Sequence, residues 1–427
     1  MMDVYDSRST PTTTKRRVLF IGEAATLAHV VRPFVLAQSL DQKLYEVIFA
    51  CDPRYNKLLG DMPFPWRPIR SIPSEQFLCN VAAGRPLFDV ASLRDYVAED
   101  LALLRECKPD LIVGDMRLSL AISAPLTNTC YMAICNAYWS PYARQRFPVP
   151  DTPLIRFIGV LAAQVLFRLV RPLAFAYHAL PVNRVRREHG LPSIGLDPRS
   201  VHSWGDYTLY PEIPELVPTF DRPDNHVYLG PLLWSPAVGH PEWWDTIPRD
   251  RPLIYLTMGS SGKGSLLDLC LQALADLPVY TIAATASQFD LSKVPANAFV
   301  ADYLPGEEAA SLANLVICNG GSPTTQQALA AGKPVLGLPS NMDQFLNMEA
   351  VARLGAGEFI RAGRAQLSAV RAAVTRMLEL SEYVEAARRL GQAFERYHAA
   401  GRFRAIVAQA LQTNSSPRPP ELVSLRK

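Results

Sequence analysis

Short apolar runs alternate along the chain with stretches that repeat apolar residues at helical spacing. Runs typical of buried strands stand at 17–22, 45–51, 109–115 and 131–137, and again at 253–258, 279–285, 315–318 and 334–338. Helical spacing follows several of them, as at 30–40, 93–107 and 364–397. Alternating strands and helices predict βαβ units with parallel strands. We therefore expect an α/β protein with Rossmann-like domains in both halves of the chain.

A proline-rich stretch at 211–250 separates the two sets of strands. Connections between domains are commonly rich in proline. We expect an N-terminal domain over 15–225, a linker over 226–250 and a C-terminal domain over 251–411. The polar ends, 1–14 and 412–427, are expected to be disordered.

Composition narrows the class of protein. With 427 residues, 49% of them hydrophobic and 19% charged, the chain resembles ordinary soluble globular proteins. A net charge of +3 without a long Lys/Arg block argues against a nucleic-acid partner. The seven cysteines lack metal-ligand spacing, which indicates reduced thiols, and residues 1–14 contain no apolar signal segment. We expect a cytoplasmic protein.

The stretch 154–180 is strongly apolar, yet it carries Arg156, Arg168 and Arg171. Its longest apolar run, 157–167, is too short to span a bilayer. A helix of this kind fits a peripheral contact with the inner face of the plasma membrane, a cover over a lipid-like acceptor, or an ordinary buried helix. The sequence leaves these alternatives open.

The densest pattern of turn and cap residues begins after the apolar run 315–318. A Gly-Gly pair at 320–321 ends that run, and a helix is expected to follow with Ser322 as N-cap and Pro323 as its first residue. The N-terminus of a helix presents unpaired N–H groups and a partial positive charge. Such an end suits a phosphate or diphosphate group.

This segment resembles the nucleotide-sugar motif of the GT-B, family-1 glycosyltransferases, His-Gly-Gly-x-Gly-Thr/Ser-x-x-Glu-Ala-Leu, followed by Gly-x-Pro and Pro-x-x-x-Asp-Gln-x-x-Asn. In this sequence the motif runs from Asn319 to Leu329 and continues in register at Gly332, Pro334, Pro339, Asp343, Gln344 and Asn347. The resemblance implies two Rossmann-like parallel-sheet domains that face each other across a cleft. It also implies transfer of a sugar from a nucleoside diphosphate to a hydroxyl group.

The resemblance also implies which residues bind the donor. The loop 259–265 matches the family's Gly-Ser loop at the diphosphate and fails as a P-loop, because Thr257 and Gly264 replace the residues that a P-loop requires. Segment 299–305 resembles Asp-Trp-x-Pro, whose ring stacks on the donor base. The implied donor-binding residues are Ser260, Tyr303, Leu304, Asn319, Gly320, Gly321, Ser322, Thr324, Gln327, Asp343 and Gln344.

His29 and Asp115 are the candidate catalytic residues. Segment 28–33 resembles Gly-His-Val-x-x-Pro, whose histidine is the catalytic base of inverting members, whereas a lone histidine here equally fits a helix cap. Asp115 ends an apolar run at the expected carboxyl edge of the sheet, where it can approach His29 and fix its tautomer. The alternative for Asp115 is a cap on a helix expected at 116–124.

We expect no metal and no redox cofactor. The turn at 22–29 is not the Gly-x-Gly-x-x-Gly fingerprint of dinucleotide enzymes, and no Asp-x-Asp pair is present to bind Mg²⁺. A nucleoside diphosphate sugar is the expected co-substrate. Helix-end N–H groups, Ser260 and Thr324 are expected to stabilise the departing diphosphate.

Three departures from the motif bear on the donor: Asn319 replaces His, Pro323 replaces Gly and Gln327 replaces Glu. An amide at 327 tolerates a ribose without its 2′-hydroxyl, which favours dTDP over UDP. Stretches 27–34 and 136–142 further resemble mycobacterial transferases that add rhamnose and other deoxysugars to phenolic glycolipids and p-hydroxybenzoate derivatives. We therefore expect dTDP-rhamnose or a similar donor, and a phenolic, lipid or natural-product acceptor.

The same departures leave two rival functions open. One is a catalytically silent protein of this fold that binds a nucleotide sugar. The other is a sugar-nucleotide epimerase, which is disfavoured because His29 stands at the place of an acceptor base.

Overall fold

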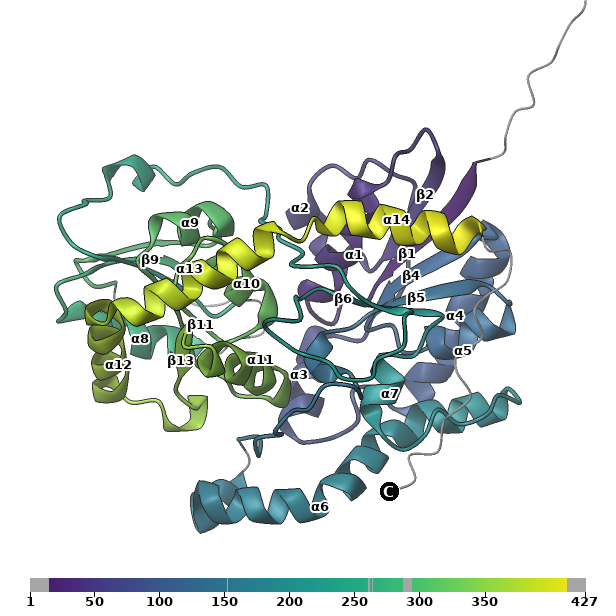
Figure 1. Ribbon diagram of the computed structural model, residues 1–427, viewed down its shortest axis with the longest axis horizontal. Helices are drawn as coiled ribbons and strands as arrows, with labels where there is room; N and C mark the ends of the chain where they lie inside the picture. Colours follow the sequence, from purple (N-terminus) through teal and green to yellow (C-terminus); the bar gives the residue numbers. More distant parts are fainter. Residues whose placement is uncertain (1–14, 152, 260–261, 263, 287–293, 413–427) are drawn as a thin grey trace, which may run out of the picture.

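The computed structural model describes residues 15–151, 153–259, 262, 264–286 and 294–412. They form two α/β domains side by side, each built on one parallel sheet (Figure 1). The segments 1–14 and 413–427, which hold nearly all of the two ends expected to be disordered, lie outside the described residues. The expectation of Rossmann-like domains in both halves is confirmed.

The N-terminal domain contains a seven-stranded sheet in the order β3-β2-β1-β4-β5-β6-β7. Its strands are β1 (Arg16–Gly22), β2 (Tyr45–Cys51), β3 (Trp66–Pro68), β4 (Leu111–Asp115), β5 (Cys130–Ile134), β6 (Tyr207–Tyr210) and β7 (His226–Tyr228). Strand β1 lies between β2 and β4, so the order of the strands reverses at this point. The loops that leave β1 and β4 therefore run to opposite sides and open a crevice, where ligands of such sheets usually bind.

Helices flank both faces of this sheet because alternate residues of its strands point to opposite sides. In β1, Val18 and Phe20 belong to one buried cluster and Leu19 and Ile21 to another, and all four are fully buried. The helices are α1 (Ala28–Ser39), α2 (Asn56–Leu59), α3 (Ser74–Ala82), α4 (Val90–Cys107), α5 (Leu120–Leu126), α6 (Pro153–Glu188) and α7 (Pro198–His202), with 3-10 turns at Pro53–Tyr55 and Ala137–Trp139.

The C-terminal domain contains a six-stranded sheet in the order β10-β9-β8-β11-β12-β13. Its strands are β8 (Leu253–Thr257), β9 (Tyr280–Ala284), β10 (Ala298–Ala301), β11 (Leu315–Cys318), β12 (Val335–Gly337) and β13 (Gly357–Phe359). Its helices are α8 (Gly264–Ala275), α9 (Gly306–Leu312), α10 (Ser322–Ala330), α11 (Met342–Arg353), α12 (Leu367–Glu379) and α13 (Ser381–Glu395), with 3-10 turns at Trp244–Thr246 and Ala362–Arg364, and α14 (Ala399–Gln412) follows α13. Here the strand order reverses between β8 and β11, so the loop after β11 lies at a second switch point.

The last helix, α14, returns to the N-terminal domain. Figure 1 shows it in yellow, continuing from α13 and lying along the upper part of the N-terminal domain. Phe403 and Val407 are fully buried in the same cluster as Phe20, and the rings of Phe20 and Phe403 lie 6.0 Å apart. The structure thus divides the chain differently from the expected C-terminal domain of 251–411, because α14 has its apolar partners on the first domain.

The expected linker of 226–250 also includes residues of the first sheet. Its first residues form β7, which pairs in parallel with β6. The remainder, after Tyr228, crosses to the second domain. Among the other predictions, the strands at 45–51 and 315–318 are confirmed residue for residue, whereas the helix expected at 116–124 is α5, which begins only at Leu120.

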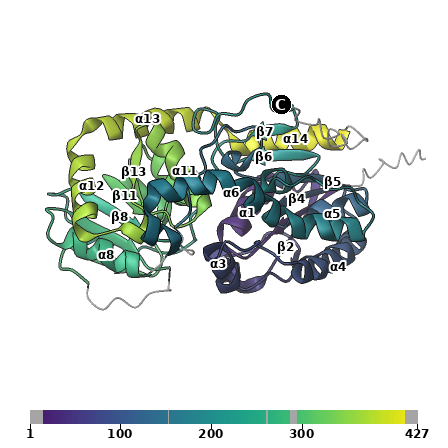
Figure 2. The ribbon, with the colours of Figure 1, turned by 90° about the horizontal axis from the view of Figure 1, so that it is seen from below.

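Helix α6 lies along the lower edge of the molecule beneath both domains (Figures 1 and 2). It breaks at Gly159, whose φ of 77° is a conformation that residues with a side chain rarely adopt. Beyond the break, one face of α6 packs toward the N-terminal domain. Most of its large apolar side chains on the other face are exposed, so the reading of this stretch as an ordinary buried helix is wrong.

Candidate active site

His29 and Asp115 meet at the first switch point. In the pairing of β1 with β4, Asp115 stands opposite Gly22 at the carboxyl end of both strands. His29 is the second residue of α1, the helix that follows β1, and it makes no capping bond to the helix start. Its Nδ1 lies 2.8 Å from Oδ1 of Asp115, and the side chains are 13% and 1% exposed. The structure thus contradicts the capping alternative for each residue, since α5 starts beyond Asp115 with Ser119 as its N-cap.

Arg32 completes this pair from one helical turn further along α1. Its Nε and Nη2 donate to Oδ2 and Oδ1 of Asp115 at 2.7 and 2.8 Å. Nη2 also lies 2.8 Å from Nδ1 of His29. Nδ1 carries a proton when it donates to Asp115 and lacks one when it accepts from Arg32. Only the first arrangement leaves Nε2 of a neutral imidazole free to accept a proton.

Asn136 links this pair to the second domain. Its Oδ1 accepts from Nη1 of Arg32 at 2.8 Å, and its Nδ2 lies 2.5 Å from Oε1 of Glu212 and 3.2 Å from the hydroxyl of Ser322. Glu212 is fully buried and also accepts from the backbone N–H of Ala137 at 2.8 Å. Burial raises the pKa of Glu212 to about 7, although these hydrogen bonds oppose the shift. A continuous polar chain therefore joins His29 to the start of α10.

The turn before α10 has the geometry expected of an anion site. Gly320 has φ of +82°, and a Cβ at this position would lie 2.7 Å from Cγ of Met348, so only glycine fits. The N-cap is Gly321 rather than the predicted Ser322, which is the first helical residue. Ser322 makes no side-chain cap, and its hydroxyl instead meets Asn136. The first turn of α10 still leaves backbone N–H groups without intrahelical partners.

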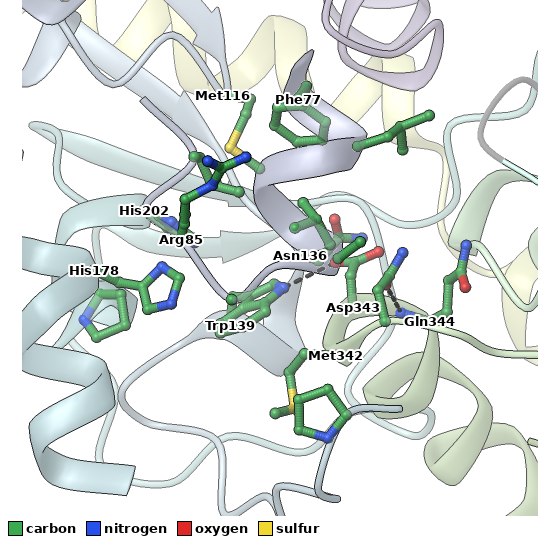
Figure 3. A pocket seen from close by; sticks show the side chains of 18 of the residues that line it. Phe77, Arg85, Met116, Asn136, Trp139, His178, His202, Met342, Asp343 and Gln344 are labelled. Carbon is green, nitrogen blue, oxygen red and sulfur yellow. Dashed lines mark hydrogen bonds between the residues drawn. The ribbon is translucent and has the colours of Figure 1, made fainter. Parts of the chain in front are cut away.

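Two further predicted donor residues lie at the start of α11. Oδ1 of Asp343 accepts from the indole N–H of Trp139 at 2.8 Å, a contact between the two domains (Figure 3). Oε1 of Gln344 accepts from the backbone N–H of Ser340 at 2.9 Å. Together with Gly321 and Ser322, Asp343 and Gln344 line the same cavity as His29. The structure thus brings the candidate base and part of the candidate donor site into one space.

The other predicted donor residues are not among those that line this cavity: Tyr303, Leu304, Asn319, Gly320, Thr324 and Gln327. Tyr303 donates its hydroxyl to the carbonyl of Ala286 at 3.1 Å. Leu304 is buried, and Oδ1 of Asn319 accepts from the N–H of Gly321 at 3.0 Å. Ser260 lies outside the described residues.

Gln327 is held by the linker between the domains. Its Nε2 donates to the carbonyl of Trp234 at 2.6 Å and lies 3.4 Å from the hydroxyl of Ser235. The carboxamide is thereby oriented with its nitrogen toward the linker. Its oxygen is the atom left to accept hydrogen bonds from another group.

The shared cavity has a volume of about 470 Å³ and lies between α3, α6 and the loop after β5 on one side and the start of α10 and α11 on the other. Most of its lining is apolar, including Phe77 and Met116, which Figure 3 labels in its upper part, above Trp139. Two histidines, His178 and His202, also line it. Burial lowers the pKa of His178 and lowers that of His202 to about 4, so both imidazoles are neutral near pH 7.

Sequence reasoning missed several residues of this site, namely Arg32, His178, His202 and Glu212. Arg32 had a local signal, because a charged residue three positions after His29 on an otherwise apolar helix face needs a buried partner. Glu212 lies in the proline-rich stretch that was read only as a connection. Nothing in the sequence pairs it with Asn136.

Within the described ranges, no group of three or more His, Cys, Asp or Glu side chains is placed to hold a metal ion. The expectation of metal-independent chemistry stays a prediction.

Comparison with known proteins identifies relatives along nearly the whole chain. Residues 268–397 match the family "Erythromycin biosynthesis protein CIII-like, C-terminal domain". A PGL/p-HBAD biosynthesis glycosyltransferase of Mycobacterium tuberculosis is 59% identical over 90% of this chain and 90% of its own length. A PGL/p-HBAD biosynthesis rhamnosyltransferase of Mycobacterium bovis is 57% identical over 90% of this chain and 85% of its own length.

Solved structures show the same fold. The spinosyn rhamnosyltransferase SpnG superimposes with a TM-score of 0.66 at 21% identity, over 92% of this chain and all of its own. Its complex with thymidine diphosphate gives a TM-score of 0.65 at 19% identity, over 92% of this chain and 100% of that chain. The two-domain architecture is therefore the GT-B fold that the motif resemblance implied.

Proposed function

This chain belongs to the PGL/p-HBAD biosynthesis glycosyltransferases, and we propose that it transfers a deoxyhexose, with inversion and without a metal, from a thymidine diphosphate donor to a phenolic hydroxyl. The observation that carries the proposal is the single cavity that has His29 on one wall and the start of α10 on another. A base and an anion site that face one space are what attack on an activated sugar requires.

His29 is the proposed base. Nδ1 donates to Asp115, and Nε2 takes the proton from the acceptor hydroxyl as its oxygen attacks the anomeric carbon. Asp115 stabilises the imidazolium ion that forms, and Arg32 fixes the orientation of the carboxylate through both of its oxygens. The bond from the anomeric carbon to the diphosphate breaks on the opposite side, so the configuration inverts.

The diphosphate leaves toward the start of α10. Its negative charge is stabilised by the N–H groups of the first turn and by the helix dipole, neither of which needs a metal ion. Asn319 replaces the histidine of the motif and supplies no positive charge. Ser322, Thr324 and Ser260 are the proposed hydroxyl contacts, and Asp343 with Gln344 is proposed to bind the sugar hydroxyls.

Gln327 supports a thymidine donor. A carboxylate at this position offers two oxygens to two ribose hydroxyls, whereas the amide of Gln327 has its nitrogen bound to Trp234 and keeps one oxygen. A single hydrogen-bond acceptor is sufficient for the sugar of a thymidine nucleotide, which lacks the 2′-hydroxyl and has only the 3′-hydroxyl to bind. The solved complex of SpnG with thymidine diphosphate and the rhamnosyltransferase among the close relatives favour the same donor, dTDP-rhamnose.

The cavity supports a phenolic acceptor. Apolar and aromatic side chains form most of its wall, and a space of about 470 Å³ accommodates an aromatic ring with an attached chain. His178 and His202 are neutral and offer hydrogen bonds without the cost of burying a charge. We propose that the enzyme works in the cytoplasm, where it meets this acceptor at the inner face of the plasma membrane.

Assays of the purified full chain with a panel of donors test this function. We expect turnover of dTDP-rhamnose with p-hydroxybenzoate esters, no loss of rate after treatment with EDTA, and inverted anomeric configuration of the product by NMR. A clear preference for UDP-glucose would overturn the donor assignment. A retained configuration would overturn the role of His29.

A catalytically silent sugar-nucleotide-binding protein is the second candidate. It is favoured by the changed residues at 319, 323 and 327, and one relative, 57% identical over 62% of this chain, is an inactive PGL/p-HBAD biosynthesis glycosyltransferase of Mycobacterium bovis. The contact between His29 and Asp115 favours catalysis instead. If the protein bound dTDP but turned over none of the donors in the panel, the function would be that of a catalytically silent binding protein.

A further inference from the structure

Helix α6 has two apolar faces that meet different surroundings. One face lines the cavity through Ala163, Phe167, Ala174, His178 and Val182. The other face carries a stripe of large apolar side chains at four-residue spacing, with exposed fractions of 85%, 59%, 74%, 75% and 48% for Leu161, Val165, Leu169, Leu173 and Tyr177. We call these five residues the α6 stripe. Contiguous exposure of this kind marks a surface that meets a partner.

The stripe is not the outer side of a helix that spans a bilayer. By length and composition alone, Phe157–Glu188 is long and apolar enough to cross a membrane, although the run 157–167 within it is too short to do so. The opposite face of α6, however, contacts α4 and α7 and lines the cavity, so protein rather than lipid meets part of the helix. A helix with one face on protein lies along a membrane surface.

The charges on α6 favour a negatively charged partner. The chain contains no Asp or Glu between 153 and 187, and Arg168, Arg184 and Arg187 are exposed. Only Arg184 has an acidic neighbour on the helix, Glu188 at 3.5 Å. If two copies of the chain met through this face, their arginine side chains would approach each other without acidic partners. A second copy therefore fits this face poorly, whereas anionic headgroups pair with arginines at the edges of an apolar stripe.

The place of α6 in the fold agrees with a membrane surface. Within the described residues, the helix lies at the lower edge of the molecule, beneath both domains (Figures 1 and 2). The same helix forms one wall of the cavity that contains His29. A bilayer in contact with the stripe would thus lie one helix diameter from the cavity.

We propose that α6 docks the enzyme on the surface of an anionic phospholipid bilayer, with the α6 stripe in the boundary between headgroups and acyl chains and the exposed arginines on the headgroups. This membrane contact does not depend on the identity of the donor or the acceptor. It can therefore be tested without substrates, separately from the proposed function.

Sedimentation of the full chain with phospholipid vesicles tests the proposal. We expect the protein to bind vesicles that contain phosphatidylglycerol at least about tenfold more tightly than vesicles of phosphatidylcholine alone, and high salt to weaken this binding. The variant Leu161→Ser/Leu169→Ser/Leu173→Ser is expected to lose at least about tenfold in vesicle affinity, because each serine removes apolar area that the bilayer would bury.

A matched control carries the same substitutions on other surfaces. Leu44, Leu196 and Leu380 are 64%, 57% and 41% exposed, and Leu44→Ser/Leu196→Ser/Leu380→Ser is expected to keep its vesicle affinity. Circular dichroism checks that both variants fold. Arg168→Glu/Arg187→Glu leaves the stripe intact and is expected to abolish the preference for phosphatidylglycerol while leaving weak binding to neutral vesicles.

Three results would overturn the proposal. The first is equal vesicle affinity of the stripe variant and the wild type. The second is a wild-type dimer that becomes a monomer in the stripe variant while neither binds vesicles, which would assign this face to a second copy. The third is wild-type protein that carbonate at high pH fails to release from membranes, which would assign α6 to a membrane span.

Discussion

The guanidinium group of Arg32 binds both oxygens of the Asp115 carboxylate, at 2.7 and 2.8 Å. The carboxylate of Asp115 therefore does not interact with His29 alone, because it also forms an ion pair with the buried guanidinium group. This arrangement gives both oxygens of the buried carboxylate a charged hydrogen-bond donor. It also holds the carboxylate plane rigidly, which fixes the direction of the imidazole across the cavity.

Replacing His29 by alanine tests the assignment of the base. We expect His29→Ala to lower kcat by about 10²-fold or more, because the variant lacks the imidazole that is proposed to take the proton of the acceptor hydroxyl, while the Kd for dTDP stays within about twofold. His189, an exposed histidine just beyond α6, provides the matched control, and His189→Ala is expected to keep full turnover. Unchanged turnover of His29→Ala would rule out this residue as the base.

Arg32→Lys tests the positioning role of the guanidinium. A lysine keeps the positive charge but cannot bind both carboxylate oxygens in one plane, so we expect kcat to fall by about tenfold with little change in KM. Removing the charge in Arg32→Met leaves Asp115 buried without its cation and is expected to cost about 3–5 kcal/mol of stability. Chemical denaturation and steady-state kinetics measure the two effects. A lysine variant with the wild-type kcat would show that Arg32 has only a structural role.

Glu212 predicts a pH dependence of stability. Its pKa in the folded protein is raised from 4.5 to about 7, so the folded state binds the proton more tightly than the unfolded chain does. The stability that this contributes is fully present below about pH 4.5 and is lost as the pH rises to about 7. At about 1.4 kcal/mol for each pH unit between these values, the loss is on the order of 3 kcal/mol.

Glu212→Gln removes this titration. We expect the free energy of unfolding of the wild type, relative to that of Glu212→Gln, to fall between about pH 4.5 and pH 7 and then to stay level. Urea denaturation of both proteins across this range measures the difference, and groups that titrate in both cancel. A difference that stays constant with pH would show that Glu212 is ionised throughout.

Gln327→Glu tests the choice of donor base. A carboxylate at 327 repels the carbonyl oxygen of Trp234, so the side chain leaves the linker and offers two oxygens to the ribose. We expect the ratio of kcat/KM for UDP-rhamnose to that for dTDP-rhamnose to rise by about tenfold, equivalent to about 1.4 kcal/mol. Gln409→Glu on α14, in the other domain, is a matched control for the change of charge. An unchanged ratio would remove Gln327 from the determinants of the donor.

The sequence predicted the parts of the fold that depend on local pattern. Apolar runs located most of the longer strands, and the motif residues located both walls of the cavity, since His29 follows β1 and Gly321 follows β11. Short strands such as β3 and β7 escaped notice because three residues show no periodicity. The sequence did predict the position of Asp115 at the carboxyl end of a parallel strand, where ligands of such sheets bind.

The parts that escaped prediction depend on contacts between distant segments. Glu212 and Asn136 are 76 positions apart, and neither has a local pattern that points to the other. The sequence did not decide whether α6 is exposed or buried. A helix rich in apolar residues has the same sequence pattern whether it packs inside a protein or contacts a membrane. The packing of α14 on the N-terminal domain was not predicted. The spacing of its apolar residues shows that one face of the helix is buried, but does not show which domain buries it.

The packing of α14 on the N-terminal domain affects the order in which the two domains can fold during synthesis. Phe403 and Val407 fill the core of the first domain, yet they are among the last described residues to leave the ribosome. Until they emerge, the buried cluster that contains Phe20 and the residues of α1 is incomplete, so we expect the core of the first domain to form fully only after the second domain has been synthesised. We therefore expect a chain cut short before α14 to destabilise the domain that holds His29, which is the domain farther from the cut in sequence.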